Sequence, residues 1–481
     1  MKLPVSWTNA PIGELCNLIN GMAFKPSDWS VSGLPIIRIQ NLNRPDAEFN
    51  YFDGQVAEKF VVEPGELLFA WSGTPGTSFG AHIWIGKRAV LNQHIFRVRF
   101  EERDIDKSFF KLAINAKLDE LIGKAHGGVG LAHVTKGKFE QTEIVLPPLA
   151  EQRRIVAKLD RLFARLARAR AELDRIPTLA DNLRKQYVSD VFDGTLTEDW
   201  RALNEGISSA TDDELSHAYA AETGFKRKKP VTEIDWRPAV DLPKSWRWVS
   251  IDQLVAEVQY GSSAKTSSDE SGVPVLRMGN IQRGKIDWTD LKYLPKDHDE
   301  FPDLLLREGD VVFNRTNSFE LVGKTAAIGK LDKAASFASY LIKLRPIGMP
   351  AELLAYYLNS SFARRWVDRV ASQQVGQANV NGSKLKALGI PLPPAEEQVE
   401  MLARISNAIA RAARLEAEAA RARALLDRLE AAILTKAFKG ELVPQDPNDE
   451  PASVLLERIR AQRTAAAPAT RANRPERAKR S

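Results

Sequence analysis

The chain has 481 residues, of which 44% are hydrophobic and 27% charged, as in a globular protein of about two to four domains. Its single cysteine, Cys16, excludes an intramolecular disulfide and fits a reducing cytoplasm; we expect no signal peptide and no membrane span. The net charge of +6 resides in the C-terminal tail, because residues 458–481 hold eight Lys or Arg and one Glu. The preceding chain is close to neutral, which is weak support for nucleic-acid binding.

The first 146 residues are predicted to form an α+β domain. Short β-branched or aromatic runs, bounded by Gly, Pro, Asn or Asp, predict strands at 34–39, 65–71 and 94–100. A helical pattern covers 107–121. The segment HGGVG (126–130) lacks the preceding strand and the following acidic residue of a dinucleotide-binding motif, so we interpret it as a flexible turn.

Residues 147–196 are predicted to form a helical spacer. The Pro-Pro pair at its start suits a helix entry, and Gly194 suits a helix end, whereas Pro177 should kink or break the helix. Apolar residues step by four and three, the pattern of a coiled-coil seam, at Ile155, Leu159, Leu162, Leu166, Ala169, Leu173 and Ile176.

Residues 197–241 are predicted to be a linker, with loop-like pieces at 206–214 and 225–230. A second α+β domain, 242–391, repeats the plan of the first, with strands at 273–278 and 309–314 and a helical pattern over 351–370. Its SFELVGKT segment, which includes Lys324, ends like a phosphate-binding loop. Ser318 stands where the leading glycine belongs, so we favour a strand-flanking loop over a nucleotide site.

Residues 392–443 are predicted to be a second helical spacer, ended by Gly440, and residues 444–481 a C-terminal extension with a basic, disordered tail. The seam residues of this helix are Met401, Ile405, Ala408, Ala412, Leu415, Ala419, Ala422, Leu426, Leu429 and Ile433. Equal lengths favour an antiparallel coiled coil of the two helices, a rod of at most ~60 Å. The alternative is that each amphipathic helix packs on its own domain.

The two halves are copies of one plan. LPPLAEQ (146–152) recurs as LPPAEEQ (392–398), and at the same offset FDGTL (192–196) recurs as FKGEL (438–442). GLPIIRIQNL (33–42) resembles GVPVLRMGNI (272–281), and LPVSW (3–7) resembles LPKSW (242–246). The chain therefore contains an internal duplication of a variable domain followed by a spacer of fixed length.

Catalytic constellations are missing from this pattern. His82, His94, His126 and His133 have no metal-ligand spacing, and a single cysteine cannot form a thiolate cluster. The Pro-Pro pairs lack the flanking residues of a base-methylating motif, and no nuclease carboxylate cluster is recognisable. The residues predict a binding protein that is not an enzyme.

The doubled motifs, together with GDVVFNRTN (309–317) and VTKGKFEQTEIVLPPLAEQ (134–152), resemble the specificity subunit of type I restriction–modification enzymes. The resemblance covers about residues 3 to 456. It implies two target recognition domains, each reading one half of a bipartite sequence in double-stranded DNA, with the paired helices setting the gap.

The resemblance further implies partners for a cytoplasmic complex. The helices would dock two methyltransferase subunits that use S-adenosylmethionine, and endonuclease/translocase subunits that use ATP and Mg would join. This chain itself would hold no cofactor and no catalytic residue. The alternative is a non-catalytic coiled-coil adaptor that binds protein or RNA.

Candidate DNA-contacting residues are polar side chains in loops that flank the shared strands, because Arg suits guanine and Asn or Gln suits adenine. Asparagines in such loops are often turn-formers, and the arginines recur at matching places, so structural roles stay open for both. In the first domain the candidate segments are 21–25, 38–41, 71–74, 92–94 and 126–136. Their candidate residues are Lys25, Arg38, Gln40, Asn41, Ser72, Thr74, Asn92, Gln93, His94, His133 and Lys136. In the second they are Tyr260, Lys265, Arg277, Asn280, Asn314, Arg315, Asn317, Gln373, Gln374, Gln377, Asn379, Asn381 and Lys384. The candidate partner-binding residues are Ile155, Leu159, Leu162, Leu166, Leu173, Met401, Ile405, Leu415, Leu426, Leu429 and Ile433.

Overall fold

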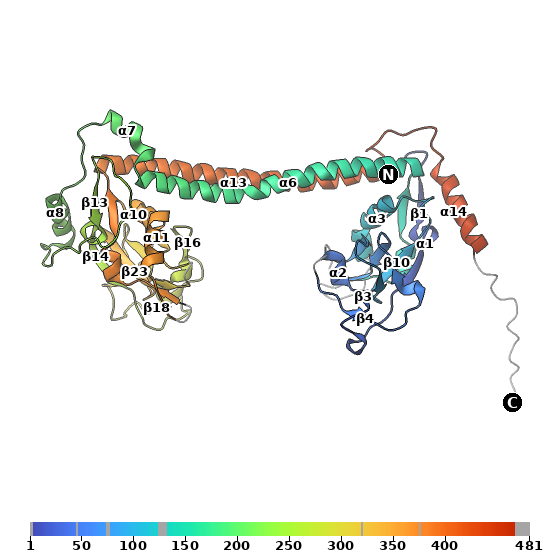
Figure 1. The fold of residues 1–481 in the computed structure, drawn as a ribbon, viewed down its shortest axis with the longest axis horizontal. Coiled ribbons are helices and arrows are strands. Elements are labelled where there is room, and N and C mark those ends of the chain that lie inside the picture. Colours follow the sequence, from blue (N-terminus) through green and yellow to red (C-terminus); the bar gives the residue numbers. More distant parts are fainter. Residues whose placement is uncertain are drawn as a thin grey trace. The chain divides into compact units, whose positions relative to one another are not determined.

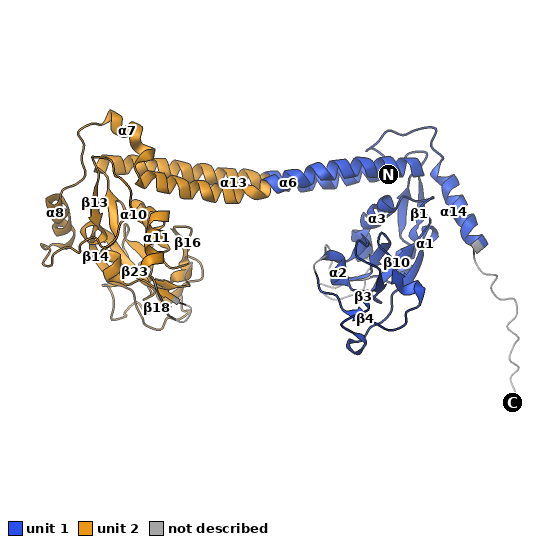
Figure 2. Ribbon diagram, in the orientation of Figure 1, with its two compact units in different colours: residues 1–172, 422–481 blue, residues 173–421 orange. Residues whose placement is uncertain are grey.

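The fold comes from a computed structural model. It describes residues 3–44, 47–73, 77–123, 132–318, 321–374 and 377–466. The chain divides into two compact units that do not follow chain order (Figure 2): unit 1 combines 1–172 with 422–481, and unit 2 is 173–421. Each unit therefore holds one variable domain and a part of both long helices.

Unit 1 is built on an antiparallel sheet in the order β2-β10-β6-β8, beside a second sheet in the order β4-β3-β9-β5. Buried aromatic rings fill its core, with Phe69 and Phe139 4.1 Å apart between ring centroids. The elements are β1 (Thr8–Pro11), α1 (Ile12–Leu15), β2 (Asn17–Asn20), β3 (Leu34–Ile37), α2 (Ile39–Asn43), β4 (Tyr51–Phe52), β5 (Val61–Val62), β6 (Leu67–Ala70), β7 (Ser72–Gly73), β8 (Gly80–Ile83), β9 (Ala89–Leu91), β10 (Ile95–Arg99), α3 (Lys107–Asn115), α4 (Leu118–Gly123), β11 (Ala132–His133), α5 (Lys136–Glu140) and β12 (Glu143–Leu146).

Unit 2 repeats this topology with a sheet in the order β14-β23-β19-β21, and a parallel pair β15-β22 that matches β3-β9. The predicted strands are confirmed in both copies, as is the α+β class. The elements are α7 (Glu198–Leu203), α8 (Asp212–Thr223), β13 (Arg247–Ser250), α9 (Ile251–Leu254), β14 (Val255–Tyr260), β15 (Val273–Leu276), β16 (Ile281–Gln282), β17 (Lys285–Ile286), β18 (Lys292–Leu294), β19 (Val311–Asn314), β20 (Thr316–Asn317), β21 (Thr325–Ala327), β22 (Ser336–Phe337), β23 (Leu341–Pro346), α10 (Ala351–Leu358), α11 (Ser361–Val370), β24 (Ser372–Gln374), β25 (Gln377–Asn379), α12 (Gly382–Lys386) and β26 (Gly389–Leu392).

The long helices α6 (Leu149–Phe192) and α13 (Ala395–Phe438) pack against each other (Figure 1). In unit 1 the beginning of α6 shares a core with the end of α13, and in unit 2 the end of α6 shares a core with the beginning of α13. The pair is thus an antiparallel coiled coil, as predicted. Gly194 and Gly440 follow the helix ends with φ of +83° and +75°, a conformation that favours glycine.

Two predictions about these helices were wrong. The helix α6 does not break at Pro177, because packing on both sides of the proline outweighs the one backbone hydrogen bond that it removes; the alternative of a kink at Pro177 stays a prediction. In α13, Leu415 and Leu429 are 47% and 49% exposed and do not belong to the seam.

The seam of α13 follows a heptad through the buried residues Ile405, Ala412, Ala419 and Ile433. The half-buried positions beside it are Glu416, which pairs with Arg184 at 2.5 Å, and Glu430, which pairs with Arg170 at 2.6 Å. The second row of contacts therefore lies one position beyond the predicted leucines, because α6 presents arginines to these carboxylates.

The two segments predicted as linker and tail contain helices. The linker holds α7 and α8, and the Thr211 hydroxyl accepts a hydrogen bond from the Glu214 backbone at the start of α8. The extension 444–481 holds α14 (Ala452–Ala466), whose Leu455, Leu456 and Ile459 are buried in the core of unit 1. The disorder predicted for the tail from Arg463 onwards is therefore wrong for 463–466. The residues after 466 lie outside the described ranges.

The basic residues at the start of the tail attach α14 to the first domain. Arg463 donates to the backbone oxygens of Gly13 and Cys16 at 2.8 and 2.9 Å, and Arg460 pairs with Glu14 at 2.7 Å. Part of the positive charge of the tail is therefore used within the fold. Along the described ranges, no helix is both long and apolar enough to cross a membrane.

Candidate nucleic-acid interface

In the first domain, loop segments that are far apart in sequence meet at one end of the main sheet. The backbone N–H of Gly21 donates to Ile95 O, that of Trp71 to His94 O, and that of Val134 to Trp71 O, at 3.2, 3.3 and 3.0 Å. The candidate segments 21–25, 71–73, 92–94 and 132–136 are thereby brought together. Sequence reasoning selected them one by one and had no evidence of their proximity.

The second domain has the same backbone hydrogen bonds at matching positions. Gly261 N donates to Leu341 O at 3.4 Å, Arg315 N to Tyr340 O at 2.9 Å, and Val380 N to Arg315 O at 2.9 Å. The pairing of β7 with β11 is also matched by that of β20 with β25. Both domains thus present the same framework at the same end of the sheet.

The side chains carried by this framework differ between the copies. The strand registers show which positions of the two domains are equivalent. Asn20 in the first domain is equivalent to Tyr260 in the second, Trp71 to Arg315, Ser72 to Thr316, His94 to Tyr340, and His133 to Asn379. A constant backbone with different donors and acceptors is suited to recognising two different polar surfaces, such as two sets of base edges.

In the second domain the polar groups surround Arg315. Its guanidinium carbon lies 4.9 Å from the centroid of the Tyr260 ring, and its Nη2 donates to Asn379 Oδ1 at 3.0 Å. Tyr260 and Tyr340 are 44% and 46% exposed. The cluster therefore combines a fixed cation with two partly exposed tyrosine side chains, and both kinds of group can contact nucleic-acid bases.

In the first domain the corresponding position is aromatic. The Trp71 ring stacks on Phe96 at 5.8 Å between centroids and lies 5.4 Å from the His94 ring. Gln93 is exposed next to it, with its Nε2 3.3 Å from His94 Nε2. This domain presents an imidazole and an amide where the other presents a guanidinium.

A further group of candidates forms turns within the fold. The side-chain oxygens of Asn41 and Asn280, both buried, accept from the backbone N–H of Arg38 and Arg277 at 3.0 and 2.9 Å, while their amide nitrogens donate to backbone oxygens. This placement favours the turn-forming role that the sequence left open. Arg277 pairs with Asp290 at 3.2 Å, and Arg38 lies over the Trp29 ring and donates to Gln40 at 3.2 Å.

The other candidates fall into three groups. The side chains with contacts inside the domain are Asn92, Asn314, Asn317, Asn381, Lys136 and Lys384. Lys25 and Lys265 are exposed. Thr74 and the side chains of His133, Gln373, Gln374 and Gln377 lie outside the described part of the structure, as does the turn 126–130.

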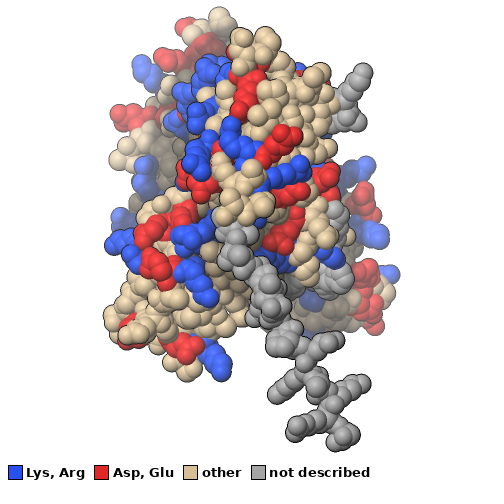
Figure 3. All heavy atoms as spheres, turned by 90° about the vertical axis from the view of Figure 1, so that its right-hand side faces the viewer, with Lys and Arg blue, Asp and Glu red and all other residues tan. Residues whose placement is uncertain are grey.

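On the face of unit 1 in Figure 3, Lys and Arg side chains are interspersed with Asp and Glu. Among the described residues, no group of three or more His, Cys, Asp or Glu could hold a metal ion. Thr325 begins strand β21 instead of a helix, so the end of SFELVGKT lacks the helix N-terminus of a phosphate-binding loop.

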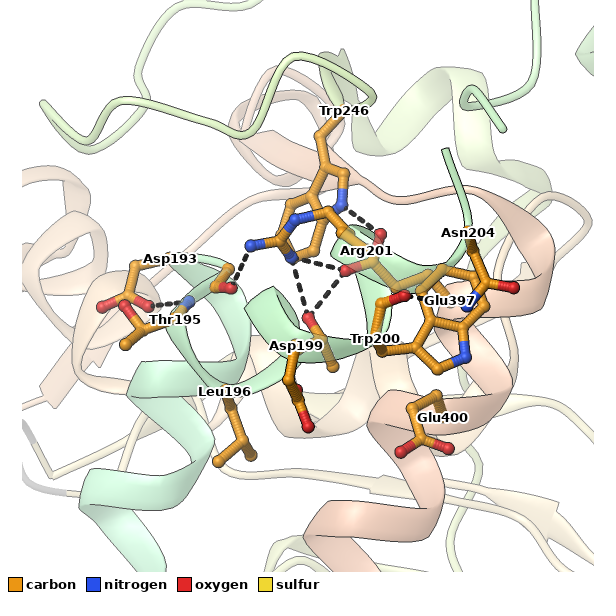
Figure 4. Close-up of polar contacts among 12 residues, drawn as sticks. Asp193, Thr195, Leu196, Asp199, Trp200, Arg201, Asn204, Trp246, Glu397 and Glu400 are labelled. Carbon is orange, nitrogen blue, oxygen red and sulfur yellow. Dashed lines mark hydrogen bonds and ion pairs between the residues drawn. The ribbon is translucent and has the colours of Figure 1, made fainter. Parts of the chain in front are cut away.

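The repeated motifs LPxxW and AEQ or EEQ form a polar clasp, which sequence reasoning recognised as a motif and did not explain. In unit 2 (Figure 4), the buried carboxylate of Glu397 accepts from Trp246 Nε1 at 2.7 Å and from Thr197 Oγ1 and Arg201 Nη1 at 2.6 Å each. Gln398 Nε2 donates to Pro393 O at 2.9 Å and so holds the turn that precedes α13.

In the matching clasp of unit 1, no arginine among the described residues donates a hydrogen bond to the carboxylate. Glu151 accepts from Trp7 Nε1 at 2.8 Å and from Gln445 Nε2 at 2.5 Å, and Gln152 Nε2 donates to Pro147 O at 2.9 Å. The proline pair, the acid and the glutamine recur in both copies because they have the same role. In each copy they hold the start of a long helix against the LPxxW segment at the beginning of the domain.

The fold and the interface define a protein with two copies of a recognition domain carried on an antiparallel helix pair. The model of the type I restriction modification DNA specificity domain matches residues 4–177 and 243–421. The chain therefore belongs to the type I restriction–modification specificity family, the DNA-recognition subunits of these systems, which are not their catalytic subunits.

Named relatives support this family, and solved structures share the fold. The specificity subunit of the type I restriction enzyme EcoBI from Escherichia coli is 27% identical over 479 residues, spanning 96% of this chain and 93% of the relative. That of EcoKI from strain K12 is 27% identical over 490 residues, spanning 96% and 97%. A chain from a study of the assembly and conformational transition of the type I R-M system has a TM-score of 0.64 at 22% identity, over 92% of this chain and 100% of that one. The HsdS subunit from Thermoanaerobacter tengcongensis has a TM-score of 0.57 at 21% identity, over 92% and 99%.

Proposed function

We propose that this chain reads a bipartite, asymmetric sequence in double-stranded DNA, one half with each domain, while the helix pair sets the unspecified gap. The observation that carries the proposal is the shared backbone framework with different side chains at matching register positions. Two linked readers gain affinity only when both half-sites lie at the span that the linkage allows.

The chain is proposed to act with partners that supply the chemistry and much of the phosphate contact. Those partners are two methyltransferase subunits using S-adenosylmethionine and endonuclease/translocase subunits using ATP and Mg. Mixed surface charge and the use of Arg460 and Arg463 within the fold support this division of labour. Binding of the complex to DNA should then fall steeply with salt, and the isolated chain should bind weakly.

A domain exchange tests the bipartite reading. The chain is co-expressed with its methyltransferase, and methylated adenines are mapped by single-molecule sequencing of the host DNA. The expected motif is split by an unspecified centre. Replacing residues 242–391 by the second domain of another family member should change one half of the motif, and replacing 1–146 should change the other. A continuous motif, or an exchange that changes both halves, would contradict the proposal.

Docking is proposed to use the exposed leucines of α13. Leu415 and Leu429 are two heptads apart, so they lie on one face of the helix, away from the seam. Leu415→Asp should weaken methyltransferase binding by ~10-fold or more, as expected for an apolar interface residue. Binding is measured by titration of the purified chain.

The control for docking is the stability of the free chain. Leu415→Asp should change thermal unfolding little, because this side chain is 47% exposed, whereas Ile405→Asp, at a buried seam position, should unfold the helix pair. Wild-type affinity of Leu415→Asp for the methyltransferase would remove this face from the proposal.

A further inference from the structure

We propose that Arg315 reads a guanine in the half-site of the second domain, with Tyr260 as its positioning residue. This inference rests on the proposed function and deepens it. It names one specificity-determining side chain and the base that it takes.

The first argument is that the guanidinium is held in place before any ligand arrives. Arg315 follows β19, its backbone is fixed by hydrogen bonds to Tyr340 and Val380, and its guanidinium lies over the Tyr260 ring at 4.9 Å. Tyr260 is itself fixed, because its hydroxyl oxygen accepts from Gly382 N at 2.7 Å. A long side chain that is already ordered loses less conformational entropy on binding.

The second argument is that the donors of Arg315 are incompletely used. A guanidinium has five N–H donors, and the recorded acceptors are Asn379 Oδ1 at 3.0 Å and Ser339 O at 3.4 Å. Within the described part of the chain, its Nε is buried without a hydrogen-bond partner. Each Nη nitrogen donates one N–H to these acceptors and carries a second N–H, so the end of the guanidinium keeps two donors for a ligand, and the buried Nε is not one of them.

The chemistry of the missing ligand follows from the fork geometry. Guanine presents two adjacent acceptors, O6 and N7, in the major groove, and a planar guanidinium matches them with two parallel hydrogen bonds. Adenine and cytosine present a donor at the same edge, and thymine presents a single oxygen, so they match less well. The half-site of the second domain should therefore contain a G·C pair that Arg315 contacts.

The third argument is the comparison with the first domain. Trp71 occupies the register position of Arg315, and an indole presents one donor and no acceptor. The two copies thus share the backbone and differ in hydrogen-bonding capacity at this position. A purely structural arginine gives no reason for such a difference between duplicated domains.

The test uses the full chain in complex with its methyltransferase. Methylation rates are measured on duplexes in which each base pair of the second half-site is changed in turn. With the wild-type chain, changing one G·C pair should lower the rate by ~10- to 100-fold. With Arg315→Gln and Arg315→Lys, the penalty at that pair should fall to about 3-fold or less, while the penalties elsewhere in both half-sites remain.

Control variants separate base reading from general effects. Lys265→Gln, an exposed cation in a neighbouring segment, should slow methylation of all duplexes alike, as loss of a phosphate contact does. Tyr260→Ala should relax discrimination at the same G·C pair as Arg315→Gln. Tyr260→Phe keeps the ring under the guanidinium and loses only the hydrogen bond from Gly382, so it should retain most of the discrimination. Assembly of each complex is checked by gel filtration; the Tyr260 pair decides the question if the Arg315 variants fail to assemble.

Several results would overturn the inference and leave the proposed function intact. They are a split motif whose second half lacks a G·C pair, undiminished discrimination at every G·C pair in the Arg315 variants, or a uniform loss over all positions. If Tyr260→Ala and Tyr260→Phe behaved alike, the positioning role would be lost. A wild-type complex without a split motif would instead overturn the proposed function itself.

Discussion

Replacing Glu397 by glutamine is expected to cost about 3 kcal/mol of unfolding free energy, because it leaves a largely buried arginine without its carboxylate. Arg201 is 19% exposed and Glu397 is fully buried, so solvent screens their pair little. Thr197 can rotate its hydroxyl towards another acceptor, whereas the guanidinium cannot accept a hydrogen bond from the new amide. The loss should be located in unit 2, where Glu397 joins the linker, the second domain and the start of α13.

The matched substitution in unit 1, Glu151→Gln, should cost less than about 1 kcal/mol. The new amide oxygen can accept from Trp7, and the Gln445 amide can turn to accept from the new N–H group, so both bonds survive. The two clasps have the same motif and different partners, and the prediction depends on that difference alone.

The pH dependence of the Glu151 variant has a definite sign. Burial raises the pKa of the Glu151 carboxyl, and this effect exceeds the opposite one of the hydrogen bonds from Trp7 and Gln445. A group with a raised pKa in the folded state favours folding most below its unfolded pKa, and that contribution is lost as the pH rises through the folded value. The unfolding free energy of Glu151→Gln should therefore increase relative to that of the wild-type chain as the pH rises from about 4 to 7.

Hydrogen exchange during denaturant unfolding is the suitable measurement, because two units need not unfold as one transition. Peptides from 3–15 report on unit 1, and peptides from 243–254 report on unit 2. Equal losses in the two variants, or a larger loss in Glu151→Gln, would show that Arg201 is not what distinguishes the clasps.

Replacing Leu455 by alanine is expected to destabilise unit 1 by about 3 kcal/mol, as removal of a fully buried leucine leaves a cavity. Leu455 lies on α14 in the core that also contains residues of α1 and of both long helices. The backbone joins it to the N-terminal segment, since Ala452 N donates to Ser6 O at 2.9 Å. Thermal unfolding and exchange in peptides 3–15 measure the effect.

The control lies next to it on the same helix. Val454 is 46% exposed, so Val454→Ala should change stability by less than about 0.5 kcal/mol. If Leu455→Ala and Val454→Ala had the same small effect, α14 would not be part of the unit 1 core, and the C-terminal extension would be dispensable for folding.

Local features of the fold could be read from the residues. The heptad pattern, the proline pairs and Gly194 and Gly440 fix where the long helices begin and end, because these signals act within one or two turns. The segment 211–214, Thr-Asp-Asp-Glu, also carries the capping-box signal of α8, although its composition predicts a loop. The residues of α13 that face α6 are harder to predict from the sequence. Neighbouring rows of apolar residues fit the four-and-three spacing equally well, and the packing of the partner helix decides which row is buried.

By itself the sequence determined the duplication, the strand and helix content and the candidate polar loops, since these depend on spacing along the chain. Only the tertiary structure decided that Tyr260, Arg315 and Asn379 meet, that Glu397 binds Trp246 and Arg201, and that α14 completes the core of unit 1. These contacts join residues far apart in the chain. They are set by how the strands pair and the cores close, which local propensity does not encode.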